Sequence, residues 1–205
     1  MTIWFTSDWH LGHENIIRFC KRPFNDAKEM DEALLTYHNE LVKPYDHVYH
    51  LGDVSMERGS KVKQEEFIKQ VDKFHGHKRL LLGNHDHFPI KCYAEVFEEI
   101  RGSGRWIENI LFSHFPVHPS SMGGCIANVH GHIHDNPSPK PVTYVPYPEV
   151  WNPETPRTDS VYQPYVNICV EQTGYKPISL DELKVRIRTA EQKYREELES
   201  EVIKL

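Results

Sequence analysis

Side chains that can bind metals or transfer protons follow several short apolar runs of the sequence, at the points where those runs end. The clearest case is the leucine run at residues 80–82, which is followed by Gly83, Asn84, His85 and Asp86. Four other apolar runs end in the same way, at residues 3–7, 48–51, 110–113 and 126–129. We expect the residues after these five runs to form one site: Asp8, His10, Asp53, Asn84, His85, His114, His132 and His134.

These side chains mix oxygen and nitrogen donors, which suits borderline divalent ions such as Mn, Fe, Zn or Co. A carboxylate between two sets of ligands can bridge two ions. Two ions about 3.5–4 Å apart bind a phosphate, lower the pKa of a shared water and stabilise the charge of in-line attack. The leaving oxygen then needs a proton, and a histidine is the side chain best suited to supply it.

The elements that must position these side chains alternate along the first half of the chain. Residues 2–7, 47–51 and 78–82 have the β-rich apolar pattern of strands, and residues 14–22 and 61–74 have helical spacing. Asp26 with Glu29 resembles a capping box before a longer helix that stops at Pro44. This alternation predicts an α/β fold with ligands at the carboxyl ends of the strands. Asp8 and His10, two residues apart in an extended chain, should face the same way.

The second half is less regular. We expect a further helix at residues 93–100, a hairpin arm or a pair of edges at 106–113, and a strand at 165–171. Ser179 with Glu182 predicts the cap of a final helix at about 180–203. Residues 136–164 are rich in proline and aromatic residues and predict a long loop. This loop is a lid that sets substrate size, a dimer contact or a half-ordered excursion, and its attachment to the last histidine cluster favours a place beside the site.

Composition limits the classes of function. The chain of 205 residues shows no break in composition, so we expect a single domain over 1–205. The net charge of -6 argues against a protein that neutralises many phosphates of a duplex. No apolar stretch approaches the roughly 20 residues of a membrane helix. The four cysteines are widely spaced, as in reduced packing residues, and the first residues lack a signal-peptide pattern, so we expect a cytoplasmic protein.

Five motifs occur in a set order: Asp8-x-His10, Gly52-Asp53, Gly83-Asn84-His85-Asp86, His114 and Gly131-His132-x-His134. In this order the sequence resembles the calcineurin-like metallophosphoesterases, and most of all the small single-domain phosphoesterases of bacteria and phages. The resemblance implies a four-layer α-β-β-α sandwich in which two mixed sheets are flanked by helices. It also implies two metal positions that share Asp53. The first would use Asp8, His10, Asp53 and His134, and the second would use Asp53, Asn84, His114 and His132.

The resemblance implies a dinuclear phosphoester hydrolase that uses a hydroxide between the ions and His85 as the general acid. Asp86 would orient His85 or its loop. The expected metal is Mn, with Fe, Zn, Co or Ni as alternatives, and the substrate is a phosphomonoester or phosphodiester such as a nucleotide. Two other functions stay open: a metal-binding scaffold of the same fold, and a nuclease for short or single-stranded nucleic acid. The presence of His85 counts against the scaffold, and the acidic charge counts against the nuclease.

Several charged residues outside the motifs have two interpretations. His13 is as consistent with a polar residue at a helix start as with a phosphate contact. Arg18, Lys21, Arg22 and Arg58 could reach a substrate phosphate, although solvated surface cations are the favoured interpretation. His130 and the remaining histidines are expected to be structural or surface residues.

Overall fold

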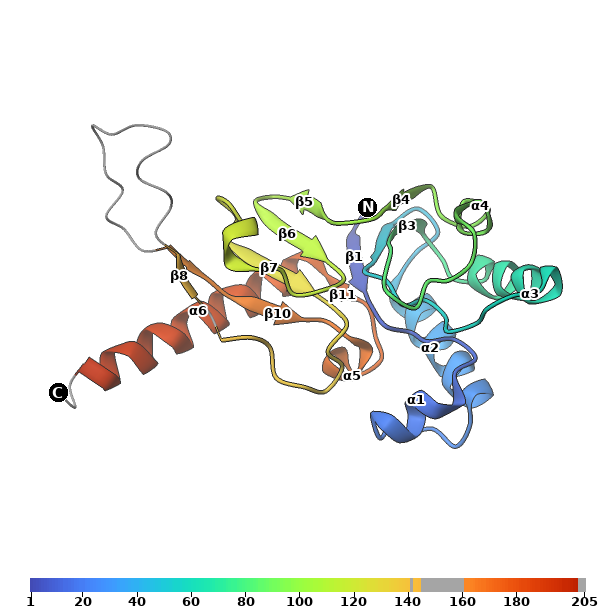
Figure 1. Ribbon diagram of the computed structural model, residues 1–205, viewed down its shortest axis with the longest axis horizontal. Coiled ribbons are helices and arrows are strands. Elements are labelled where there is room, and N and C mark those ends of the chain that lie inside the picture. Colours follow the sequence, from blue (N-terminus) through green and yellow to red (C-terminus); the bar gives the residue numbers. More distant parts are fainter. Residues whose placement is uncertain (141, 145–160, 203–205) are drawn as a thin grey trace.

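The computed structural model describes residues 1–140, 142–144 and 161–202 (Figure 1). The first sheet has the order β11-β1-β2-β3-β4. Its strands β1 (Ile3–Thr6), β2 (His47–His50), β3 (His77–Leu81) and β4 (Glu99–Arg101) run parallel, and β11 (Ile178–Ser179) runs antiparallel to β1. The parallel strands deliver the residues that follow them to one edge of this sheet.

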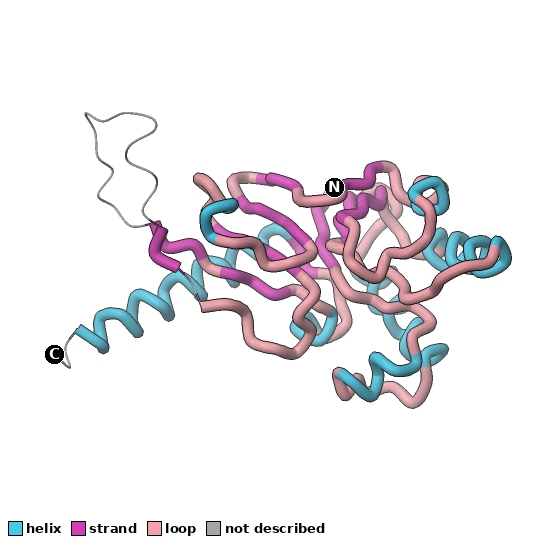
Figure 2. The backbone as a smooth tube through the Cα atoms, viewed as in Figure 1, coloured by secondary structure: helices cyan, strands magenta, loops and turns pink. Residues whose placement is uncertain are grey.

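The second sheet has the order β10-β7-β6-β5. Its strands β6 (Ile110–Ser113), β7 (Ala127–His130) and β10 (Tyr165–Asn167) run parallel, and β5 (Arg105–Ile107) pairs with β6 as an antiparallel hairpin. The expected arrangement of two mixed sheets flanked by helices is therefore confirmed. Figure 2 shows the strands in the middle of the molecule and most of the helices around them.

The longer helices begin and end where local chemistry predicts. In α2 (Ala27–Leu41), the Asp26 side chain accepts a hydrogen bond of 2.8 Å from the Glu29 amide. In α3 (Lys61–Asp72), Ser60 has the same capping role. The last helix, α6 (Leu180–Val202), begins with the Glu182 amide donating to the Ser179 hydroxyl at 3.2 Å. Among the described residues, no helix combines the length and the apolar character needed to cross a membrane.

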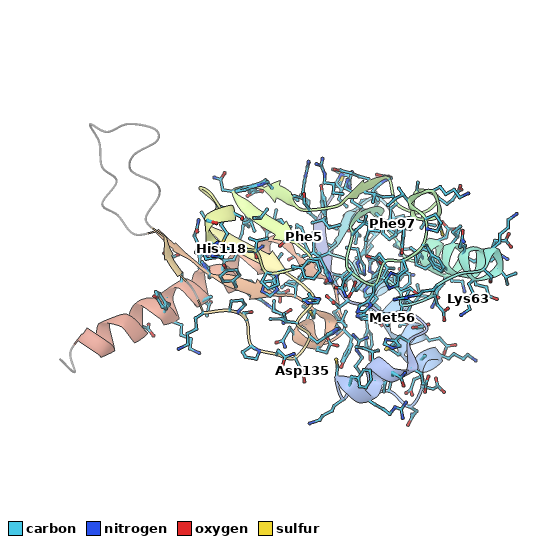
Figure 3. All side chains as sticks on the ribbon, viewed as in Figure 1. Phe5, Met56, Lys63, Phe97, His118 and Asp135 are labelled. Atoms are coloured by element: carbon cyan, nitrogen blue, oxygen red, sulfur yellow. The ribbon has the colours of Figure 1, made fainter. Side chains whose placement is uncertain are left out.

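The hydrophobic core has two main parts. One part lies between the sheets, where the Phe5 and Phe112 rings stack with centroids 4.2 Å apart, and α6 adds Leu183 and Ile187 to it. Figure 3 shows Phe5 near the middle of the molecule and Lys63 toward its edge. The other part lies between the first sheet and the helices α2 and α3, and it includes Trp9, Met30, Leu34, Phe67, Val71 and Phe74. Both parts hold the ends of β1 to β3 in fixed positions.

Three expectations for the second half need correction, and the first two concern residues 93–100 and 136–164. The helix predicted at residues 93–100 is wrong, because the short α4 (Ile90–Tyr93) ends at the first of these residues and β4 follows. Ile100 pairs with Leu80 of β3, so a distant strand pairing overrides the local helical spacing. The predicted loop at residues 136–164 contains two short strands, β8 (Val142–Tyr144) and β9 (Val161–Gln163), which form an antiparallel pair. Residues 141 and 145–160 of that loop lie outside the described residues.

The remaining short elements complete the described fold. They are α1 (Glu14–Phe19), the 3-10 helix η1 (Pro119–Ser121) and α5 (Val170–Thr173). The strand predicted at residues 165–171 is shorter than expected, because β10 stops at Asn167 and α5 begins three residues later. That early stop places Cys169 and Glu171 beside the strand ends described next.

Candidate metal centre

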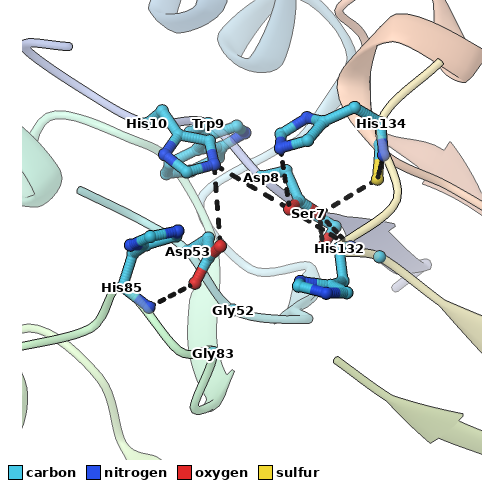
Figure 4. Close-up of polar contacts among 12 residues, drawn as sticks. Ser7, Asp8, Trp9, His10, Gly52, Asp53, Gly83, His85, His132 and His134 are labelled. Atoms are coloured by element: carbon cyan, nitrogen blue, oxygen red, sulfur yellow. Dashed lines mark hydrogen bonds and ion pairs between the residues drawn. The ribbon is translucent and has the colours of Figure 1, made fainter. Parts of the chain in front are cut away.

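The carboxyl ends of five strands from both sheets meet at one place. From the first sheet, β1 is followed by Asp8 and His10, β2 by Asp53, and β3 by Asn84 and His85. From the second sheet, β6 is followed by His114, and β7 by His132 and His134. Figure 4 shows His10 beside the carboxylates of Asp8 and Asp53, with His85, His132 and His134 around them. All eight candidate residues therefore lie around one centre.

Asp53 lies between two groups of possible ligands. Its Oδ2 atom is 3.6 Å from Nε2 of His10 on one side and 3.4 Å from Nε2 of His114 on the other. One group of donor atoms, from Asp8, His10 and Asp53, lies within 4.8 Å, and a second, from Asp53, His114 and His132, lies within the same distance. This geometry would let Asp53 bridge two ions, which is the role that the resemblance implies for it.

Two more ligand candidates stand at the margins of these groups. His134 places its Nε2 atom 3.9 Å from Oδ1 of Asp8, beside the first group. Asn84 places its Oδ1 atom 3.0 Å from Nε2 of His114, beside the second group. The two sets that the resemblance implies are therefore distinct in space and share Asp53.

Some buried polar atoms at this centre have no hydrogen-bond partner in the described part of the chain, and they indicate whether cations would fit there. Both ring nitrogens of His10 and the Oδ2 atom of Asp53 are buried and have no hydrogen-bond partner among the described residues. Buried polar atoms are nearly always paired, so unpaired ones need an explanation. Imidazole nitrogens and carboxylate oxygens together are suitable donors for divalent Mn, Fe, Zn or Co. The residues present therefore fit a pair of divalent cations.

The charges around the centre support the same conclusion. Burial lowers the pKa of His10 well below its ordinary value, so its imidazole is neutral and one ring nitrogen has a lone pair for a metal. Burial alone would raise the pKa of Asp53, but the neighbouring His114 and the His85 amide hold it below its ordinary value. Burial also lowers the pKa of His134, but Cys20 and Glu171 raise it to about 10. The carboxylates of Asp8 and Glu171 beside His134 therefore favour positive charge at this position.

The backbone of the ligand residues is unusual. Five of the seven candidate metal ligands have a left-handed backbone, with φ of 59° at Asp8, 53° at His10, 56° at Asp53, 71° at His132 and 50° at His134. Such values are uncommon outside glycine and often mark strained functional residues. Asp8 and His10 face the same centre as expected, but strand alternation is not the cause, because β1 stops at Thr6. Both reach the centre through the left-handed turns that follow the strand.

Two motif glycines permit close approach of the chain. A Cβ atom at Gly83 would lie 2.2 Å from Oδ1 of Asp53, and one at Gly131 would lie 2.3 Å from Oδ2 of Asp8. Any larger residue at these positions would collide with a candidate ligand. Gly83 and Gly131 are therefore required at these positions because they have no side chain.

Asp86 orients the loop rather than the His85 ring. Its carboxylate accepts hydrogen bonds from the amides of Asp53 (2.9 Å), Val54 (2.9 Å) and Gly83 (2.7 Å). Burial raises its pKa to about 6, against the effect of these amides. Asp86 thus connects the turn after β2 to the turn after β3. Of the two roles expected from the sequence, these bonds fit the orientation of the loop.

Several residues at the centre were missed or misjudged from the sequence. Arg22 is not a solvated cation, because it is only 4% exposed and pairs with Glu171. Cys169 does more than pack, because its Sγ atom lies 3.2 Å from Oδ2 of Asp8. The Ser7 hydroxyl also donates to Asp8. No sequence motif marks these residues, since Arg22 and Glu171 are 149 positions apart.

The charged residues and histidines outside the motifs lie around the candidate ligands or farther from them. The His13 ring is half-buried with its centroid 5.6 Å from that of His10. Arg58 is exposed and donates to Nε2 of His87 at 2.8 Å. Arg18 and Lys21 are exposed, as the favoured interpretation expects. His130 is fully buried in β7, and its Nδ1 atom lies 2.9 Å from the Gly131 carbonyl, which fits a structural residue.

Known proteins match most of this chain. Residues 1–182 match the calcineurin-like phosphoesterase family. An uncharacterised protein of Methanocaldococcus jannaschii is 31% identical over 179 residues, which is 87% of each chain. The gene 66 protein of Mycobacterium phage L5 is 32% identical over 132 residues, or 55% of this chain and 62% of the phage protein. The crystal structure of a protein of unknown function from Aquifex aeolicus has a TM-score of 0.64 at 28% identity and covers 89% of this chain and 97% of its own. The chain therefore belongs to the calcineurin-like phosphoesterases, a family of metal-dependent hydrolases that act on phosphoesters.

Proposed function

We propose that the protein hydrolyses small phosphomonoesters or phosphodiesters, with nucleotides among its substrates, at a dinuclear metal centre. The observation that carries this proposal is the position of Asp53, whose Oδ2 atom faces His10 at 3.6 Å and His114 at 3.4 Å. A single carboxylate oxygen between two imidazoles suits a bridge between two cations. Its second oxygen, Oδ1, accepts a hydrogen bond from the His85 amide and so fixes the direction of the bridge.

Seven side chains would hold the two ions, of which Mn is the expected metal. Asp8, His10 and His134 would serve the first position, Asn84, His114 and His132 would serve the second, and Asp53 would serve both. When bound, such a pair of ions attracts the phosphate, makes water more acidic and offsets the negative charge that builds during displacement. The chain itself contributes a rigid arrangement of ligands, because each follows a strand whose neighbours pack in the core.

His85 would give a proton to the leaving oxygen. Its backbone is fixed to Asp53, and its ring centroid lies 5.5 Å from that of His10, so the ring stands at the edge of the centre. The Nδ1 atom of His85 is buried without a hydrogen-bond partner among the described residues, which leaves the ring free of competing bonds on that side. A scaffold that only binds metal has no evident need for this side chain.

The proposal is tested by purifying the protein with Mn and measuring hydrolysis of p-nitrophenyl phosphate and bis-p-nitrophenyl phosphate. Asp53→Ala should abolish both hydrolysis and the binding of the second ion. His85→Ala should retain both ions and lose most of the activity, because positioned proton transfer typically contributes about 10²–10⁴-fold. Unchanged activity in both variants would reject the proposal. Bound metal together with absence of activity in the wild type would favour the metal-binding scaffold.

A further inference from the structure

A buried ion pair stands directly behind one candidate ligand. The Nη2 atom of Arg22 lies 2.7 Å from Oε1 of Glu171, and the Nε atom of Arg22 donates to the same oxygen at 2.9 Å. The two side chains are 0% and 6% exposed. Oε1 also accepts from the ring of His134, whose Nδ1 atom lies 3.1 Å away. In the neutral imidazole this carboxylate favours the proton on Nδ1, which leaves the lone pair of Nε2 facing Asp8.

The same arginine also supports the backbone of the first motif. Arg22 donates to the carbonyl of Asp8 at 2.8 Å and to the carbonyl of Trp9 at 2.9 Å. These carbonyls belong to the left-handed turn that carries Asp8 and His10 into the centre. Arg22 and Glu171 thus contact three of the four candidate ligands of the first position, either directly or through the adjoining backbone.

The second position has a different support. The Nδ1 atom of His114 lies 2.8 Å from the carbonyl oxygen of Leu51, which is neutral. Glu171, in contrast, places its carboxylate oxygen Oε1 at 3.1 Å from Nδ1 of His134. Its other oxygen, Oε2, is buried and has no hydrogen-bond partner among the described residues. His134 of the first position therefore has a carboxylate behind it, which is paired with Arg22, whereas His114 of the second position has a neutral carbonyl.

We infer that Glu171, held in place by Arg22, is a positioning residue that makes the first metal position the tighter and first-filled of the two. A carboxylate behind a ligating imidazole fixes its tautomer, raises its basicity and adds attraction for a cation. Arg22 holds the carboxylate in this orientation and keeps it from turning into the centre as a ligand. This inference rests on the proposed dinuclear centre and adds an order of filling to it.

Titration of the metal-free protein with Mn²⁺ tests the inference without an activity assay. Calorimetry of the wild type should give two binding events of unequal affinity. Glu171→Gln keeps the size of the side chain and an acceptor oxygen but removes the charge. It should weaken the tighter event by about 10–100-fold, the usual effect of changing a partner behind a metal ligand, and leave the weaker event unchanged.

Asp31→Asn is the matched control. Asp31 is a partly buried carboxylate that accepts from the Gly12 amide at 3.0 Å and from Gln70 at 2.7 Å. The substitution removes a negative charge next to the first motif without touching a candidate ligand, so both Mn²⁺ affinities should stay at the wild-type values. Arg22→Lys keeps the positive charge but cannot make all four bonds, and it should weaken the tighter event less than Glu171→Gln does. If Glu171→Gln does not fold, Arg22→Lys decides the question.

The outcomes separate the two proposals. Two unequal events in the wild type, with only the tighter one weakened by Glu171→Gln, would support the inference. Equal weakening of both events, no change in either, or the same change in Asp31→Asn would overturn it while leaving the dinuclear centre intact. A wild type that binds fewer than two Mn²⁺ ions would overturn the inference and the dinuclear proposal together.

Discussion

The backbone amide of His85 donates a hydrogen bond of 2.8 Å to Oδ1 of Asp53. The proposed proton donor is therefore attached, through its own backbone, to the proposed bridging ligand. Oδ2 of Asp53 faces the imidazoles, while Oδ1 fixes the turn after β3. The Asp53 carboxylate thus helps to fix the position of His85 relative to the proposed metal centre. It connects the proposed metal bridge with the proposed proton donor, which belong to separate sequence motifs.

The first prediction concerns the leaving group. His85→Ala should reduce kcat more for alkyl phosphates than for p-nitrophenyl phosphate, because an alkoxide needs a proton to leave and p-nitrophenolate does not. The measurement is kcat for a series of esters with leaving groups of increasing pKa. His77→Ala, at the opposite end of β3, is the control, since His77 is exposed and pairs with Glu98. An equal reduction across the whole series would argue against proton donation by His85.

The second prediction concerns the close approach at Gly83. Gly83→Ala would place a methyl group 2.2 Å from Oδ1 of Asp53, so the turn or the bridging carboxylate must move. We expect Mn²⁺ binding to fall and the free energy of unfolding to decrease by about 1–3 kcal/mol, as for other overpacked sites. Gly102→Ala is the control, because a Cβ at Gly102 meets no atom within 4 Å. Calorimetric Mn²⁺ titration and urea unfolding would measure both effects, and identical behaviour of the two variants would contradict the explanation.

The third prediction concerns Asp86. Asp86→Ala leaves the amides of Asp53, Val54 and Gly83 without their acceptor. Each buried group that loses its partner costs about 1–3 kcal/mol, so the metal-free protein should lose at least about 3 kcal/mol of unfolding free energy. Asp86→Asn keeps one acceptor oxygen and should fall between the alanine variant and the wild type. Urea unfolding without metal measures this order, and an asparagine variant no more stable than the alanine variant would show that the three bonds do not act as described.

The fourth prediction concerns pH and His38, a buried residue of α2 far from the motifs in sequence. Burial lowers the pKa of His38 from 6.5 to about 4, with Lys78 lowering it further and the bond to the His75 carbonyl opposing the shift. The unfolded chain binds this proton below pH 6.5 and the native protein only near pH 4. Stability from neutral His38 is therefore complete above pH 6.5 and is lost as the pH falls toward 4. Between pH 7 and pH 5, protonation of His38 in the unfolded chain should lower the free energy of unfolding by about 2 kcal/mol.

Urea unfolding of the metal-free protein at pH 7 and pH 5 tests this expectation. His38→Gln retains a side-chain donor for the His75 carbonyl, which lies 2.9 Å from Nε2 of His38, but it cannot titrate. The glutamine variant should lose less stability than the wild type over this range. If both proteins lose the same amount, other groups are responsible for the pH dependence.

The sequence predicted the parts of the molecule that depend on neighbouring residues. The cap at Asp26, the strands before Asp8, Asp53 and Asn84, and the final helix follow from local spacing and capping. The convergence of the candidate ligands could also be expected, because parallel strands place their carboxyl ends together. The roles of these residues as metal ligands and proton donor stay predictions until the variants are measured.

Other features depend on contacts between distant residues, and the sequence does not indicate them. The burial of Arg22 depends on Glu171, which lies far away in the chain, so the arginine resembled a surface cation. The strand at Glu99–Arg101 exists because β3 has an edge to pair with. The left-handed turn at Asp8 and His10 replaced the extended chain that local propensity favours, since packing and the Arg22 bonds fix its carbonyls.

The left-handed backbone of the candidate ligands has a consequence for how this protein can change. Glycine adopts such φ values freely, whereas aspartate and histidine do so at a conformational cost of about 1–2 kcal/mol per residue. Asp8, His10, Asp53, His132 and His134 all carry this cost. Substituting glycine at any of them would relieve local strain while removing a ligand, so selection for stability alone would erode the centre. The metal-free fold is therefore less stable with these five side chains than it would be with glycine at the same backbone positions.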